Sequence, residues 1–508
     1  MRMIALPRQF GDVLWRVALS AAIVGLAALV VAQQVVFPQP RIIKVTVLAL
    51  LLVIMLRLQT VYSLYLFVIL MMFPSGIALT STNVVLMTLI PLLWVVRARA
   101  LRQALIAPTP VDRAIAFFLL AFIVAFAHVK GTHALVMNLK MLWRQLAALA
   151  FFYLIVTFVD DEKKLSGITK AIAISAGLLA FTAVVELFAP GSALIPGWIS
   201  TGSHDFGALG MRIEGMRVYG SVGSHSLVGD YVSMSLFFVV LHFLRARNPI
   251  ENLFWVIVFA VSFPAVLATA NRGAFVALVV GVGYSFWIFR RFLGLGRVMV
   301  LVGAIVALFA GGELVLKKFT YAASATERVM ATTFEMGVVP DNRRGAWIPA
   351  LSRSMEHPIV GHGPWYDTGI GLEKKAWPHN AYIFNLYTLG IVGLAAMLLI
   401  RYRVFKISWD AVRRYPPGKG QGLASSMMGI LHILLVMHLL HMGRTDFERP
   451  GDSIYIFIVW MLFGLIVAAA RIQKEKHALR APDPDRSSAP PPPHGAARRR
   501  ASRGEAPR

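Results

Sequence analysis

The sequence predicts an all-α polytopic membrane protein with about 12–14 transmembrane helices, and three observations support this fold class. Apolar runs recur from residue 13 to residue 470. Most of them approach the length of about 20 residues that a helix needs to cross a bilayer. Only 15% of the 508 residues are charged, against roughly a quarter in soluble domains.

The apolar runs give the order of the expected helices. The second, third and fourth runs are short, so the number of spans stays between 12 and 14 by this reading. The runs lie near residues 17–36, 42–56, 58–73, 83–96, 114–127, 142–159, 171–189, 231–244, 253–270, 274–289, 298–316, 380–400, 424–442 and 454–470.

Basic residues cluster in alternate loops, which predicts the orientation. Short cytoplasmic loops of membrane proteins carry an excess of Lys and Arg. The basic loops lie at 97–113, 163–164, 245–247, 290–297 and 401–419, and both termini fall on the same side. This bias explains the formal net charge of +25 without nucleic acid as a partner.

This topology divides the chain into five parts. A long connection within a membrane bundle is usually functional. The expected parts are a cytoplasmic N-terminus (1–16), a transmembrane bundle (17–316) with a periplasmic loop (190–230), a large periplasmic loop (317–378) with an amphipathic helix, C-terminal transmembrane helices (379–470), and a disordered basic cytoplasmic tail (471–508).

Two classes of chemistry find no support in the sequence. The chain has no cysteine, which excludes disulfides, thiol catalysis and thiolate metal ligands. His357, His362 and His379, with Glu356 and Asp367, match no compact zinc spacing. We therefore expect no metal and no cofactor.

Arginines stand at two predicted helix starts on the outer side. Arg217 and His225 lie in "RVYGSVGSHSLVGDY", where glycines let backbone amides approach an anion. Arg272 lies in "ANRGAF" between two spans. Both arginines suit phosphate binding, whereas the alternatives are solvated loop charges for Arg217 and snorkelling to lipid head groups for Arg272.

The large outer loop contains a predicted amphipathic helix. Asp341 or Asn342 can cap it, and Trp347, Ile348, Leu351 and Met355 recur at helical spacing before Pro358. Arg343 and Arg344 stand at its positive end, where the helix dipole favours an anion. The alternative for these two arginines is a salt-bridged surface pair.

His379 opens the apolar stretch "PHNAYIFNLYTLGIVG". Pro378 suits a first helical turn, and Asn380 can cap the helix or orient the imidazole. An imidazole at this boundary can remove a proton from a sugar hydroxyl, or it can serve as an interfacial anchor. Gly390 and Gly393 predict close helix packing.

Three histidines lie on the next-to-last span. His432, His438 and His441 are ionisable groups within lipid, which are functional candidates by default. His441 lies near the outer mouth, where it can act in a gate or in an ion pair.

These motifs together resemble the O-antigen ligase and polymerase superfamily of bacterial envelope proteins. The ligase pattern is matched by His379, Asn380, nine residues, Gly390, two residues and Gly393. "RRGAWIPALSRSMEHPIVGHG", "RVYGSVGSHSLVGDY" and "ANRGAF" are similar to three further segments of that family. "SHS" departs from the usual pattern, which leaves the role of His225 open.

The resemblance implies a metal-independent glycosyltransferase in the bacterial inner membrane, with both termini cytoplasmic and the active face periplasmic. Such proteins transfer a glycan from undecaprenyl diphosphate to a lipid or glycan acceptor, within membrane lipid and without nucleic acid. By position, Arg217, Arg272 and Arg344 would hold the diphosphate and His379 would activate the acceptor hydroxyl. The supporting residues would be Arg343, Asn380, His225 and His441.

Three alternatives stay open at this point. A repeat-unit polymerase of the same superfamily shares these motifs and differs in its acceptor. A lipid-linked glycan flippase predicts interrupted helices near the midplane and charges deep in the bundle. A structural scaffold predicts that point changes in the outer loops have no effect.

Overall fold

The computed structural model describes residues 54–55, 58–72, 92, 94–96, 107–188, 204–205, 216–290, 310–314, 318, 341–365, 378–417, 422–443 and 453–480. Seven helices in this part are long and apolar enough to cross a membrane, and two apolar helices are shorter. The all-α polytopic fold class is therefore confirmed. The spans expected near 17–36, 42–56, 83–96 and 298–316 lie wholly or largely outside the described residues.

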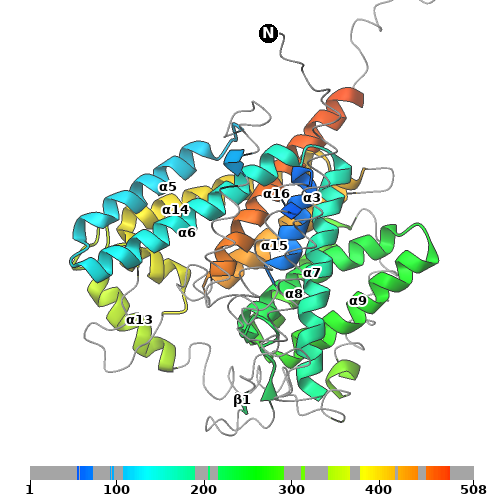
Figure 1. The fold of residues 1–508 in the computed structure, drawn as a ribbon, viewed down its shortest axis with the longest axis horizontal. Coiled ribbons are helices and arrows are strands. Elements are labelled where there is room, and N and C mark those ends of the chain that lie inside the picture. The colour runs from blue at the N-terminus through cyan, green and yellow to red at the C-terminus, as the bar shows by residue number, and fades with distance from the viewer. Residues whose placement is uncertain are drawn as a thin grey trace, which may run out of the picture.

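The described elements follow one another as the hydropathy pattern predicts (Figure 1). Ten of the expected spans coincide with helices in the following set. The elements are α3 (Thr60–Leu70), α5 (Asp112–Val124), η1 (Ala125–His128), α6 (Thr132–Phe158), α7 (Glu162–Phe188), β1 (His204–Asp205), β2 (Met216–Arg217), α8 (His225–Arg245), α9 (Pro249–Ala268), α10 (Arg272–Ile288), α13 (Asp341–Ser354), α14 (Ala381–Arg414), α15 (Leu423–Met442) and α16 (Ser453–Arg480).

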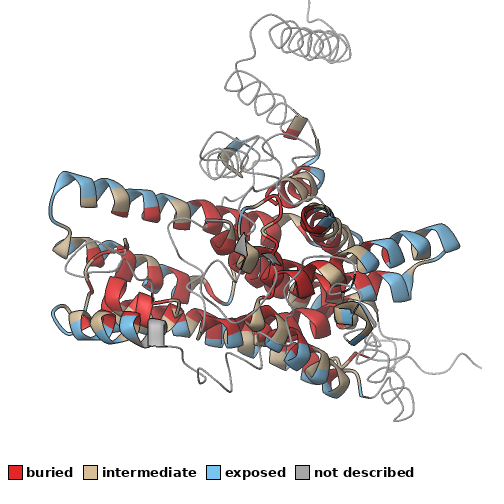
Figure 2. Ribbon diagram, turned by 90° about the horizontal axis from the view of Figure 1, so that it is seen from below, coloured by how far each residue is buried: buried red, intermediate tan, exposed pale blue. Residues whose placement is uncertain are grey.

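Helices α15 and α16 form the centre of the bundle. They pack against each other and are buried along most of their length, as Figure 2 shows for the core as a whole. A helix that is apolar on every side is expected in such a central position. Helices α5 and α9 instead expose large apolar side chains such as Leu120 and Ile257, as helices facing lipid do.

The predicted outer loops meet at one end of the bundle, which we call the His379 end. Helices α7, α9 and α15 end there, and α8, α10, α14 and α16 begin there. This arrangement agrees with the alternation that the basic loops predict. The joining contacts are Glu186 with Gly220, Val218 with Ala268, Asn271 with Asp230, Tyr455 with Asp230, and Asn380 with Gly443.

Helix α14 is broken at Gly390, which corrects the prediction of one continuous span near 380–400. Gly390 has φ 65° and ψ −168°. A straight helix would separate residues 380 and 401 by about 30 Å. Asn380 nevertheless reaches the Gly443 carbonyl at 3.3 Å, and Arg401 Nε lies 2.9 Å from Met442 Sδ. The helix must therefore fold back, so α14 consists of two arms, 381–389 and 391–414.

The segment 357–363 fills the break with its own backbone. His362 N donates to the Tyr387 carbonyl and Gly363 N to the Thr388 carbonyl, both at 3.0 Å. In return, Ile391 N donates to the Pro358 carbonyl at 2.8 Å. Backbone groups released by a break in a membrane helix need such partners, because lipid offers none. The predicted packing glycine Gly390 thus occupies a turn that other residues enter only with strain.

The helix expected after Asp341 is present as α13. Its Trp347 and Ala350 pack against Ile383, Phe384 and Tyr387 in the first arm of α14. Its other side exposes Ile348, Leu351 and Met355. Of the predicted apolar face, only Trp347 rests on the bundle, whereas Ile348, Leu351 and, just beyond the helix end, Met355 are exposed.

Two helices continue beyond their apolar runs. Helix α14 extends to Arg414 through the predicted basic loop, and α16 extends to Arg480 through the first part of the predicted disordered tail. Gln473 is buried and donates to the Tyr415 carbonyl and to Ser425 Oγ. Long polar side chains such as Gln473 hydrogen-bond to neighbouring helices. Helix α16 therefore continues beyond the end of its apolar run. Residues 481–508 lie outside the described residues.

Candidate functional site

Arg217 is a buried arginine in β2, shortly before the start of α8. This strand pairs with β1 in an antiparallel two-residue ladder, and Val218 N donates to the Ala268 carbonyl at 3.2 Å. The Arg217 side chain is 8% exposed. Burial lowers its pKa, but a guanidinium stays protonated in proteins. The structure therefore holds a fixed positive charge beside the entrances of α8 and α10.

His225 is brought directly to Arg217. Arg217 Nη1 donates to His225 Nε2 at 2.8 Å, which assigns the imidazole proton of a neutral His225 to Nδ1. His225 is the first residue of α8, and Ser224 caps the helix by accepting from Leu227 N. The two predicted residues thus stand together at a helix N-terminus, where the dipole favours an anion.

Arg272 opens α10 on a tightly constrained turn. Ala270 has φ 45°, and the Asn271 side chain then caps the helix by accepting from Gly273 N at 3.1 Å and Ala274 N at 3.5 Å. Arg272 is itself partly buried. The turn therefore holds a guanidinium at the positive end of a helix.

His379 repeats this arrangement at α14. It has φ 45°, and Asn380 caps the helix by accepting from Tyr382 N at 3.0 Å and Ile383 N at 3.2 Å. Trp347 Nε1 donates to the Pro378 carbonyl. A left-handed backbone at a non-glycine residue costs about 1–3 kcal/mol and is found at functional sites. Pro378 lies before the cap, not in the first turn as its residue type predicts.

A buried carboxylate joins these helix ends. Asp230 Oδ1 accepts from Asn271 Nδ2 at 3.1 Å, and Asp230 Oδ2 accepts from the Tyr455 hydroxyl at 3.0 Å. His441 Nδ1 lies 3.6 Å from Asp230 Oδ1. This contact is an ion pair only when the imidazole of His441 is protonated. Sequence reasoning passed over Asp230 as a site residue, although an acidic residue within a span is itself a signal.

The structure thus gathers most, but not all, of the predicted residues. Arg217, His225, Arg272, His379, Asn380 and His441 lie at the His379 end. The side chains of Arg343 and Arg344 lie outside what the structure describes, but their backbone forms the first turn of α13, one turn before Trp347. His432 lies elsewhere, bonded to Ser408 and Tyr284. His438 is buried against Phe463.

The histidines of the large loop form a separate cluster. His128 stacks on His357 with ring centroids 3.8 Å apart, and His357 meets His362 at 4.8 Å. His128 Nδ1 donates to the Gly361 carbonyl at 2.9 Å. Among the described residues, no group of three His, Asp or Glu side chains is placed to hold a metal ion. These rings instead pack beside the break in α14, where His128 contacts Gly361 and His362 stacks on Tyr387.

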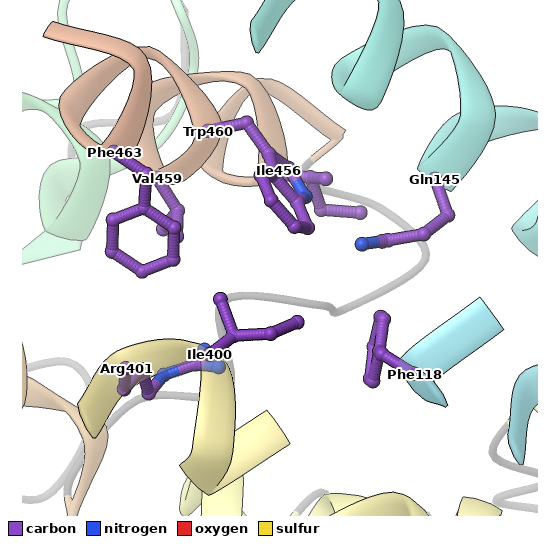
Figure 3. Close-up of a pocket in the computed structure, with 8 residues that line it drawn as sticks. All are labelled: Phe118, Gln145, Ile400, Arg401, Ile456, Val459, Trp460 and Phe463. Atoms are coloured by element: carbon purple, nitrogen blue, oxygen red, sulfur yellow. The ribbon is translucent and has the colours of Figure 1, made fainter. Parts of the chain in front are cut away.

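Arg401 is a buried charge that the sequence placed in a cytoplasmic loop. It is 7% exposed, donates to the Met397 carbonyl, and lies over the Phe463 ring at 5.9 Å. It lines a small cavity together with Gln145 and six apolar side chains (Figure 3). Its buried position depends on contact with Met442, which lies on another helix. No local sequence pattern around Arg401 indicates this contact.

Comparison with known proteins supports the same part of the chain. No curated protein matches the sequence. Residues 257–398 match the family described as O-antigen ligase. The matched range contains Arg272, Arg344, His379 and the two glycines of the motif, whereas Arg217, His225 and His441 lie outside it. The match confirms the resemblance given by the sequence motifs: over residues 257–398, this multi-pass membrane protein is similar to the O-antigen ligase family.

Proposed function

We propose that the protein is a glycosyltransferase that moves a glycan from undecaprenyl diphosphate to an acceptor hydroxyl on the periplasmic face of the inner membrane. The observation that carries this proposal is that the segments of Arg217, Arg272 and His379 lie at the same end of the bundle. These residues are far apart in the sequence. Each lies at or beside the N-terminus of a different helix.

The arginines suit a diphosphate leaving group. A guanidinium offers paired donors that match phosphate oxygens, and the leaving diphosphate gains negative charge as the glycosidic bond breaks. Preorganised positive groups therefore stabilise the transition state more than the ground state. Arg217 and Arg272 supply such groups, and we expect Arg344, at the start of α13, to supply a third.

His379 suits the role of general base. Its neutral imidazole accepts the acceptor hydroxyl proton while that oxygen attacks the anomeric carbon. The bond from the anomeric carbon to the diphosphate oxygen breaks, and undecaprenyl diphosphate leaves with the bonding electron pair. An attack from the side opposite the leaving group inverts the anomeric centre. The constrained backbone at His379 supports this role, because holding the reacting groups in fixed geometry lowers the activation free energy of such a transfer.

The proposed sidedness follows from the basic loops and has a direct test. With the positive-inside rule, both termini are cytoplasmic and the His379 end faces the periplasm. The absence of cysteine makes single-cysteine labelling clean. Cysteines at exposed Met355 and exposed Arg290 should react with an impermeant thiol reagent from opposite sides of the membrane. Labelling of both from one side would contradict this topology.

The catalytic proposal is tested by His379→Ala and Arg272→Ala with purified undecaprenyl diphosphate donor. Loss of a general base lowers rates by about 10²–10⁴-fold, and we expect a loss in this range for His379→Ala. Arg272→Lys should restore only part of the rate, because lysine keeps the charge but not the paired donors. The matched control is Arg290→Ala, which removes an exposed arginine from the far end of α10. Normal transfer by both alanine variants would sink the proposal.

A repeat-unit polymerase remains the alternative within the same family. It would use the same His379 end but would extend a lipid-linked glycan. Supplying purified protein with donor alone, and separately with donor and lipid acceptor, distinguishes the two. Products that lengthen in steps without a second acceptor would identify the polymerase.

Two observations favour the flippase as a second candidate. Helix α14 is interrupted at Gly390, and Arg401 is buried inside the bundle, as a transporter predicts. However, the break is occupied by the backbone of 357–363 rather than by an open binding site. Movement of the donor across vesicles without formation of a glycosidic bond would reverse our ranking.

A further inference from the structure

We propose that Asp230 is a positioning residue, which holds the Arg272 turn and the end of α15 in fixed relation while the donor reacts. This inference rests on the proposed transferase function. Asp230 lies outside the family match and carries no role in the sequence motifs. It would act through the groups it binds, without touching the substrate.

The geometry places Asp230 where four helices meet. The carboxylate belongs to α8, Asn271 caps α10, His441 lies in the last turn of α15, and Tyr455 lies in the first turn of α16. Asn271 donates to one carboxylate oxygen at 3.1 Å and Tyr455 to the other at 3.0 Å. A single side chain therefore fixes the relative position of all four helix ends.

A purely structural role would not require a charge at this point. Asp230 is 3% exposed, and a carboxylate is costly to bury unless it is paired and hydrogen-bonded. Well-packed apolar residues often stabilise a protein as much as a buried ion pair does. Ionisable side chains within membrane segments are accordingly associated with function.

The mechanism of positioning follows from the two ends of the Asn271 amide. Its oxygen caps α10 by accepting from Gly273 N and Ala274 N, while its nitrogen donates to Asp230. The carboxylate thus fixes the orientation of the amide, and the amide fixes the turn that carries Arg272. Helix α8 and this turn are close together, because a Cβ at Gly229 would lie 3.1 Å from Asn271 Cβ.

The same carboxylate is connected to the other arginine. Asp230 follows His225 on α8, and His225 accepts from Arg217 at 2.8 Å. A shift of the Arg272 turn relative to α8 would therefore change the spacing of the two guanidinium groups. Misplacement of reacting groups by about 1 Å can lower a rate about 100-fold.

The test exchanges the two partners. Asn271→Asp places a second carboxylate next to that of Asp230, and the two repel each other. We expect transfer to fall about 100-fold. Asp230→Asn alone should lower transfer about tenfold, since it keeps the shape but loses an acceptor. In the double variant D230N/N271D, the new amide donates to the new carboxylate and still accepts from Tyr455, while only the longer contact to His441, at 3.6 Å, loses its carboxylate oxygen. The carboxylate still caps α10, so transfer should return to within a few-fold of the wild type.

All rates are measured per folded protein, with the thermal midpoint recorded for each variant. Ser408→Ala is the matched control, because it removes a buried hydrogen bond to His432 away from the His379 end. It should lower the midpoint without changing transfer. Absence of rescue in the double variant, or an Asp230→Asn variant that transfers as well as Ser408→Ala, overturns the inference.

His379→Ala separates this inference from the function on which it rests. An inactive His379→Ala without rescue in the exchange variant would leave the transferase proposal standing and remove the role of Asp230. Normal transfer by both His379→Ala and Arg272→Ala would remove both, because the positioning of Arg272 would then have no effect on the reaction. An inactive His379→Ala together with rescue supports both.

Discussion

Gly361 and Gly390 face each other across the break in α14. Their φ values are 74° and 65°, a backbone region that other residues rarely adopt. A Cβ at Gly361 would lie 2.6 Å from Gly390 N, and a Cβ at Gly390 would lie as close to Val360 N. Each glycine is therefore required for two reasons: its own segment has a positive φ there, and the backbone of the other segment leaves no room for a side chain.

Gly390→Ala should destabilise the protein strongly. At φ 65° and ψ −168°, Gly390 is in a backbone region that is essentially restricted to glycine and costs other residues about 1–3 kcal/mol, and the clash with the 357–363 backbone adds to this. Gly283→Ala is the matched control within a helix, because a Cβ there meets no atom within 4 Å. We expect the midpoint of thermal unfolding in detergent to fall for Gly390→Ala and to stay or rise for Gly283→Ala. A Gly390→Ala variant that unfolds at the same temperature as the wild type would show that the break is absent in solution.

Acidification should weaken the histidine cluster over the break. Burial, together with the neighbouring His128 and His362, lowers the pKa of His357 below its ordinary value, while Glu356 opposes this shift. The folded state therefore prefers the neutral ring, and the unfolded state binds more protons below about pH 6.5. The contribution of His357 to stability is present above that pH and is lost as the pH falls towards the lowered pKa.

The measurement is the unfolding midpoint between pH 7.5 and pH 5.5. His357→Gln should fall less over this interval than the wild type, because the glutamine does not titrate. His477→Gln provides the comparison, since His477 stacks on Tyr415 away from this cluster. A pH dependence identical in wild type and His357→Gln would contradict the assignment.

The sequence predicted the features that depend on neighbouring residues. Asn380 was expected at a helix start because capping is a local interaction, and it caps α14. The cap expected from Asp341 or Asn342 lies outside the described side chains, although α13 begins at Asp341. The ten described spans follow from hydropathy alone. The position of His379 beside a helix start, at the same end as Arg217 and Arg272, follows from counting spans.

The features that the sequence did not reveal depend on distant segments. Gly390 has the residue type for a break, but the break also requires the backbone of 357–363, which hydrogen-bonds the groups that the break releases. Arg401 follows an apolar run and so resembles a loop charge, yet Met442 and Phe463 enclose it after α14 folds back. The role of Asp230 requires Asn271 and Tyr455 from two other helices. Local patterns contain none of these partners.

Trp347→Phe should lower transfer more than it lowers stability. The indole of Trp347 donates to the Pro378 carbonyl, directly before His379. Phenylalanine keeps most of the packing on α14 but loses this hydrogen bond, which is worth about 1 kcal/mol. We expect roughly tenfold slower transfer through loss of the His379 geometry. Trp287→Phe, at an exposed position on α10, should leave transfer unchanged. Normal transfer by Trp347→Phe would show that this contact does not position His379.

Truncation at two points tests whether the end of α16 belongs to the folded bundle. Arg471 Nη2 donates to the Val159 carbonyl at 3.1 Å, Gln473 bonds to Tyr415 and Ser425, and Lys476 lies 2.7 Å from Glu162.

A chain ending after residue 470 loses all three side chains and leaves buried acceptors unsatisfied, at about 1–3 kcal/mol for each buried group. We expect its thermal midpoint to fall by roughly 5 °C or more. A chain ending after residue 480 keeps every one of these contacts and should keep the wild-type midpoint. If both truncated chains unfold at the wild-type temperature, residues 471–480 contribute nothing, and the prediction of a tail beginning at residue 471 would stand after all.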